Sequence, residues 1–145
     1  MAYENILLAS SNILALIPII NSNNFIFKKL LLVLMFFSFL HHLTETNQVN
    51  HNLEGIHVPF FSYYADILRY IDIFLAYLTF LFIIIEIGLI NSFKFIYNYL
   101  FSLLIAIYCC YLCDYVIKES IYYFYLHLLW HILIYYILYK LTFLL

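Results

Sequence analysis

The sequence predicts an all-α membrane protein: a single domain over residues 1–145, built as a bundle of about five transmembrane helices. Three observations support this fold class. First, 68% of the 145 residues are hydrophobic and only 10% are charged, whereas soluble domains average about 45–50% apolar and about 25% charged residues. Second, the apolar residues gather in runs close to the length of about 20 residues that crosses a bilayer. Third, most connections between the runs are short, which favours antiparallel neighbours.

The five apolar runs differ in how well each one predicts a span. The first is short and contains Pro18. Because it lacks the basic start and the small-residue cleavage site of a signal peptide, we expect it to be retained as a span. Short polar connections are expected at 21–24, 91–94 and 118–120. The expected helices are Ile6–Ile20, Phe25–Leu43, Ile67–Ile90, Phe95–Ile117 and Ile121–Leu145.

The basic residues predict an orientation in the membrane. With five spans, the N-terminus, the long connection 44–66 and the 118–120 turn lie on one side, together with Arg69 and Lys118. The opposite side carries four basic residues, and the side richer in Lys and Arg usually faces the cytoplasm. The 44–66 connection is therefore expected to face the lumen or the exterior. The four basic residues of the cytoplasmic side are Lys28, Lys29, Lys94 and Lys140.

This orientation can be tested at the long connection. A cysteine in place of Asn50 should react with a membrane-impermeant maleimide added from outside, because residue 50 lies in the middle of the connection predicted to be extracytoplasmic. Labelling that requires the membrane to be opened first would reverse the topology.

Polar residues within the apolar runs are predicted to lie at one end of the bundle. Ser38 and His42 are four residues apart near the end of the second run, and Asp72 lies about one turn inside the third. His127 and His131 stand in the first turns of the fifth run, and their spacing places both imidazoles on one helix face. Because the second run ends on the side where the third and fifth begin, all five residues share one leaflet.

These residue types are typical of a catalytic zinc site. His42, His127 and His131 would supply three imidazole ligands and leave a fourth position for water, which zinc activates near neutral pH. Asp72 is the expected proton acceptor, which then returns a proton to the leaving group. Ser38 could donate a hydrogen bond to the water or to a developing oxyanion.

Each of these residues also has a simpler interpretation. The two histidines of the fifth run could form hydrogen bonds between helices, and Asp72 could pair with Arg69 one turn earlier. Ser38 could donate to the carbonyl oxygen of Leu34, as serines in membrane helices commonly do. His41 points about 100° away from His42 and is expected at the membrane interface.

Two further patterns are weaker. A stripe along the third run is expected to be its inward face, with its last member, a glutamate, in a structural or interfacial role. The three cysteines, close to Asp114, could bind a metal, form a disulfide or carry acyl chains, but they are expected to be packing residues. Their odd number gives no disulfide framework. The stripe comprises Asp72, Ala76, Thr79, Ile83 and Glu86, and the cysteines are Cys109, Cys110 and Cys113.

The ordered motifs "SFLHHLTE", "LRYIDIF" and "HLLWH" resemble the CREST superfamily of membrane hydrolases and receptors, and most closely its branch of myomaker-like proteins and GPI-anchor phospholipases. That superfamily has Ser-x3-His, an Asp early in the next helix, and His-x3-His in the last helix. On this match Glu45 is the acidic residue three positions after the histidine, while Thr44 and Leu128 stand where the branch has cysteine and serine. The family usually has seven helices, so this chain resembles a shortened member.

The resemblance implies a zinc cofactor and hydrolysis of amide or ester bonds in lipids. The leading hypothesis is therefore a zinc-dependent intramembrane hydrolase whose substrate is a lipid of the bilayer. One alternative is a non-enzymatic membrane-remodelling or fusion protein in which zinc braces three helices. Another is a binding or transport module that uses the histidines as a relay. With a net charge of −2 and no basic patch, nucleic acid is not an expected partner.

Overall fold

The computed structural model describes residues 2–44, 64–115 and 122–145, and within those ranges the regular structure is helical, without a strand. This confirms the predicted all-α class. The predicted 118–120 turn, Glu45 and residues 45–63 of the predicted long connection lie outside the described residues. The elements are α1 (Ala2–Ser11), the 3₁₀ helix η1 (Asn12–Ala15), α2 (Leu16–Asn21), α3 (Phe25–Thr44), α5 (Ala65–Ile87), α6 (Leu89–Asn98), α7 (Leu100–Tyr115) and α8 (Tyr122–Leu141).

Three of these helices, α3, α5 and α8, are long and apolar enough to cross a membrane. The pair α6 and α7 would form a fourth span only as a broken one, because the two helices meet at an angle of 80°. The apolar segment of α1, η1 and α2 is shorter and covers Ile6–Asn21. The described chain thus has three to four candidate spans and one shorter apolar segment, which is compatible with a bundle of about five helices.

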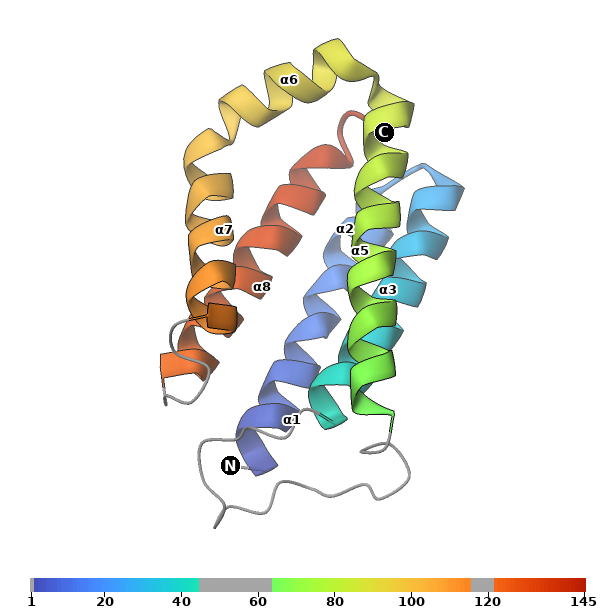
Figure 1. Ribbon diagram of the computed structural model, residues 1–145. Helices are drawn as coiled ribbons and strands as arrows, with labels where there is room; N and C mark the ends of the chain where they lie inside the picture. Colours follow the sequence, from blue (N-terminus) through green and yellow to red (C-terminus); the bar gives the residue numbers. More distant parts are fainter. Residues whose placement is uncertain (1, 45–63, 116–121) are drawn as a thin grey trace.

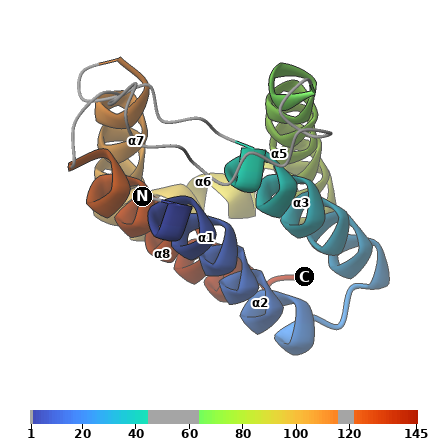
Figure 2. The same ribbon diagram turned by 90° about the horizontal axis from the view of Figure 1, so that it is seen from below.

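The helices are arranged as a horseshoe when the molecule is viewed along its long axis (Figure 2). The segment α1–α2 packs against both α3 and α8. Helix α5 packs against α3 and helix α7 packs against α8, so α5 and α7 are the two ends of the horseshoe. Helix α6 crosses one end of the bundle and joins α5 to α7 (Figure 1). At the opposite end, α1, α5 and α8 begin and α3 ends, so residues from the last turns of α3 and the first turns of α8 meet there.

Asn24 precedes α3 and caps its first turn. Its side-chain Oδ1 accepts hydrogen bonds from the backbone N–H groups of Ile26 and Phe27, both at 3.0 Å, and so satisfies donors that the first helical turn leaves without a partner. Its own N–H donates to Ser22 Oγ at 3.1 Å. The predicted short connection at 21–24 is confirmed, with α2 ending at Asn21 and α3 beginning at Phe25.

The predicted connection at 91–94 is wrong, because these residues lie inside α6. Asn91 Nδ2 donates to Ile87 O at 3.0 Å and Ser92 Oγ donates to Gly88 O at 2.8 Å. Both polar side chains are thus satisfied by the backbone one turn earlier, a known pattern within helices. The chain instead changes direction at Gly88, with φ 76° and ψ 157°, and again at Tyr99. The predicted fourth helix, 95–117, is therefore divided between α6 and α7.

Gly88 has a conformation that essentially only glycine adopts, at a cost of about 1–3 kcal/mol for other residues. A β-carbon there would meet no atom within 4 Å, so Gly88→Ala isolates the backbone term. We expect this variant to lower the free energy of unfolding by about 1–3 kcal/mol, measured by denaturant titration in detergent. Ile90→Ala, on the exposed face of α6, is the control and should lower the free energy of unfolding less. Equal losses in the two variants would contradict a role for the backbone conformation of Gly88.

The apolar core lies toward the end that α6 crosses, and comprises Phe27, Leu31, Ile83, Ile87, Phe95, Ile137 and Leu141. The predicted inward stripe of α5 is only partly correct. Thr79 and Ile83 are buried, whereas Ala76 and Glu86 are exposed. The reason is that α5 packs chiefly against a single helix, α3, so its buried face is narrow. Glu86 Oε1 accepts a hydrogen bond from Asn24 Nδ2 at 3.2 Å.

Candidate metal centre

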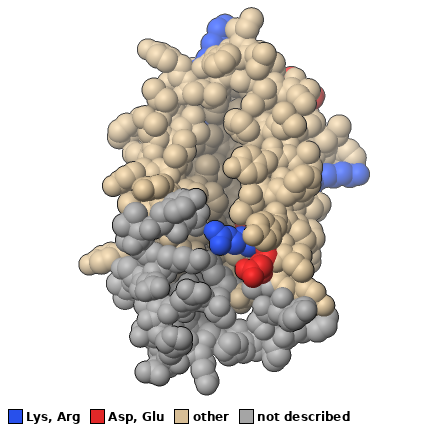
Figure 3. Space-filling view, in the orientation of Figure 1, with Lys and Arg blue, Asp and Glu red and all other residues tan. Residues whose placement is uncertain are grey.

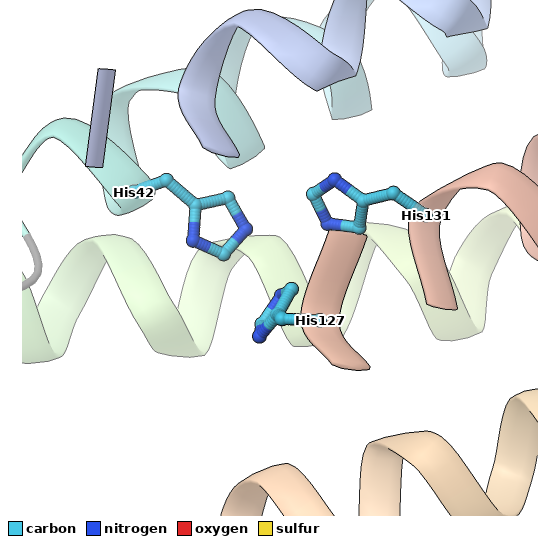
Figure 4. Close-up of side chains that lie close together, drawn as sticks. All are labelled: His42, His127 and His131. Carbon is cyan, nitrogen blue, oxygen red and sulfur yellow. The ribbon is translucent and has the colours of Figure 1, made fainter. Parts of the chain in front are cut away.

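Three histidines from two helices converge where the last turn of α3 meets the first half of α8 (Figure 4). His42 stands in the last turn of α3, and His127 and His131 are on one face of α8 because they are four residues apart. The ring centroids are separated by 4.7 Å between His42 and His127, 5.0 Å between His42 and His131, and 4.9 Å between His127 and His131. The rings thus form a nearly equilateral triangle.

The donor atoms of this triangle fit a metal ion. One nitrogen of each ring lies within 4.8 Å of the others, and the three residues are 2%, 9% and 2% exposed. A tetrahedral ion with bonds of about 2.0–2.1 Å to each nitrogen places neighbouring nitrogens about 3.3 Å apart. The donor nitrogens would therefore need to approach one another by up to about 1.5 Å, which small side-chain rotations allow. Neutral imidazole is a ligand that zinc and other transition metals favour, so the buried group could hold such an ion.

His41 lies beside this cluster without being part of it. Its ring centroid is 4.9 Å from that of His42 and its side chain is half-buried. Among the described residues, the only group of three or more possible ligand side chains gathered in this way comprises His42, His127 and His131. The three cysteines do not belong to it, and no disulfide joins them within the described chain. Cys109 and Cys113 are buried, as expected for packing residues.

Ser38 is one turn before His42 on α3 and is 5% exposed. Thr79 and Ser92 each donate to the carbonyl oxygen four residues earlier, at 2.8 Å. Within the described residues, the corresponding bond from Ser38 to Leu34 is not formed. Ser38 and His42 are both buried and, being four residues apart, lie on the same face of α3.

Asp72 is placed in the first half of α5 and is partly exposed. It is not one of the residues whose donor atoms gather within 4.8 Å. Asp72 therefore lies outside the possible ligand set, and its role as proton acceptor stays a prediction.

Two polar residues of the first segment contact α8, and neither contact was predicted from the sequence. Ser11 Oγ lies 2.6 Å from His131 Nδ1, and Tyr135 donates a hydrogen bond to Asn12 Oδ1 at 2.6 Å. Ser11 and Asn12 are both buried. The sequence does contain a signal for them, the polar triplet "SSN" at 10–12. Like the histidines of the fifth run, these polar residues stand inside an apolar run.

Aromatic side chains border the cluster on α8. The ring centroid of Trp130 is 5.2 Å from that of His127 and 5.0 Å from that of His131, and Tyr123 lies 5.1 Å from His127. Trp130 also lines a groove of about 350 Å³ between α7 and α8, together with Leu103, Ala106, Ile107, Cys110, Tyr111 and Ile134. The space-filling view shows the face between the α7 side and the α5 side hollowed, with walls that are mostly neither basic nor acidic (Figure 3).

No protein-family model, curated protein or solved structure that was compared with this chain matches it. The chain is a membrane-type helical protein with a buried cluster of three histidines that could bind a metal ion.

Proposed function

We propose that this protein is a zinc-dependent intramembrane hydrolase that cleaves an acyl amide or ester bond of a lipid. The observation that carries this proposal is the triangle of His42, His127 and His131, which is buried inside a bundle of apolar helices. Three imidazoles and an open fourth position are the usual ligand arrangement of catalytic zinc, whereas structural zinc sites are commonly closed by four protein ligands. Membership of the CREST superfamily is part of the proposal, on the order of the motifs along the chain.

In this proposal the three histidines hold zinc, which supplies an activated water and polarises the carbonyl of the substrate. Asp72 accepts one proton of the attacking water and returns it to the leaving nitrogen or oxygen as the acyl C–N or C–O bond breaks. Ser38, buried one turn before His42, donates a hydrogen bond to the oxygen of the acyl group as negative charge develops there. The products are a fatty acid and an amine or alcohol, so the atoms of one water are consumed.

A lipid substrate is supported by the surroundings of the site. The histidines lie in the first turns of α8 and the last turn of α3, at the depth of one leaflet if these helices cross the membrane. The hollowed face between the α5 and α7 sides has largely uncharged walls (Figure 3), so an acyl chain could approach sideways from the bilayer. On the orientation predicted from Lys and Arg, the site faces the lumenal or extracellular leaflet.

The direct test is release of fatty acid from defined lipids. Purified protein loaded with zinc should hydrolyse at least one lipid of a panel of ceramides, phospholipids and glycolipids in mixed micelles, with the fatty acid measured by mass spectrometry. A His127→Gln variant is the background control. A protein that holds zinc but releases no fatty acid from any of these lipids would contradict the hydrolase.

A structural zinc brace is the second candidate function, as part of a membrane-remodelling or fusion protein. It is favoured by one observation: the three donors come only from α3 and α8, and α1 packs against both of these helices. A metal at this point would tie the two arms of the horseshoe together at the end opposite α6. The two functions differ in whether Asp72 is required.

A further inference from the structure

The first segment of the chain reaches the metal centre through one short contact. Ser11 Oγ is 2.6 Å from His131 Nδ1, and both residues are buried. The same hydroxyl is also 2.6 Å from the carbonyl oxygen of Leu8, one turn earlier on α1. Ser11 therefore has two close polar neighbours and one hydrogen to share between them.

The positions of the hydrogens follow from these two distances. Two oxygen atoms 2.6 Å apart need a hydrogen between them, and a carbonyl oxygen has none to give. Ser11 therefore donates to Leu8 O. The contact with His131 then needs its hydrogen from the imidazole, so Nδ1 is the protonated nitrogen. Since a neutral imidazole carries one N–H, Nε2 of His131 has the lone pair.

That lone pair faces the other two histidines. In Figure 4 one ring nitrogen of His131 points toward the ribbon of α1 and the other toward the space between His42 and His127. Nδ1 is the nitrogen that contacts Ser11, so Nε2 is the one directed into the cluster. A histidine that binds a metal usually donates its other N–H to an oxygen, which fixes both tautomer and ring orientation.

We propose that Ser11 is a positioning residue of the metal centre, which holds His131 in the Nδ1–H tautomer so that Nε2 is presented to the metal. This inference rests on the proposed metal site. It extends that site from α3 and α8 to the first helical segment, which carries none of the motifs that predicted the ligands. The hydrogen bond from Tyr135 to Asn12 joins the same two segments. Asn12 follows Ser11 by one residue and Tyr135 follows His131 by one turn, and this bond does not involve a histidine nitrogen.

The tautomer can be measured without metal. In protein labelled with ¹⁵N-histidine, the imidazole nitrogen shifts of His131, assigned by their loss in His131→Gln, should show a single Nδ1–H tautomer. In Ser11→Ala the tautomer should change or become mixed. Ser10→Ala is the matched control, because Ser10 is the exposed neighbour of Ser11 on α1, and it should leave the signals unchanged. An Nε2–H tautomer in the wild type would overturn the proposal.

Metal affinity provides the second measurement. Zinc affinity, from competition with a chromophoric chelator, should fall about 10–100-fold in Ser11→Ala, the usual effect of losing such a partner. Tyr135→Phe removes an equally short hydrogen bond between the same segments, so it should stay close to the wild type if orientation of His131 is the cause. Equal losses in both variants would overturn the positioning role. A wild type that binds no zinc would instead refute the proposed function, while the nitrogen shifts would still decide the tautomer.

Discussion

Replacing His131 by alanine should release the metal from the protein. In the proposed site His131 is one of three ligands, is 2% exposed, and its ring centroid is 5.0 Å from His42 and 4.9 Å from His127. Removing its ring takes away a direct bond, so the loss of affinity should exceed the about 10–100-fold that follows loss of an outer partner. Elemental analysis after gentle purification should find about one zinc per chain in the wild type and almost none in His131→Ala.

His41→Ala is the control for this experiment. His41 is next to His42 in the sequence, and its ring centroid is 4.9 Å from that of His42, but it is not in the group of possible ligands. The variant therefore removes an imidazole from the same turn of α3 and should keep its zinc. If both variants lose metal alike, the assignment of His42 as the ligand of α3 is wrong. If the wild type holds none, the site does not bind zinc.

The approach of the three histidines could be predicted because it depends on local spacing and on chain direction. Four residues separate His127 from His131, so a helix of any length places their rings together. Antiparallel connections then bring the end of α3 to the start of α8. Neither step requires knowledge of side-chain packing. The same reasoning predicted the start of α3 at Phe25, where Asn24 accepts hydrogen bonds from the first turn.

Other features could not be predicted because polar residues have more than one way to be satisfied. Asn91 and Ser92 looked like a connection, but both donate to the helix backbone, so they continue α6. The turn depends instead on Gly88, whose φ of 76° has no sequence signature other than the glycine itself. Ser11 and His131 are 120 positions apart, and only the packing of α1 against α8 reveals their contact.

The two candidate functions require different things of Asp72. A brace needs only the three ligands, and Asp72 is not among the side chains whose donor atoms gather there. A hydrolase also needs a group that takes a proton from water and returns it to the leaving group. Asp72 lies in the first half of α5 and is partly exposed. Its substitution should therefore separate binding of the metal from turnover.

Asp72→Asn is expected to keep the fold and the zinc but to reduce lipid hydrolysis by roughly 10²-fold or more, because an amide cannot accept the proton. The rate is measured as fatty acid released from the best lipid of the panel, with zinc content and thermal unfolding recorded on the same sample. Asp66→Asn, the same change at an exposed position of α5, should retain full activity, and Arg69→Gln should have a far smaller effect than Asp72→Asn. If Asp72→Asn and Arg69→Gln both unfold the protein, the role of Asp72 is a structural ion pair. If Asp72→Asn hydrolyses lipid at the wild-type rate, another group accepts the proton and Asp72 is not catalytic.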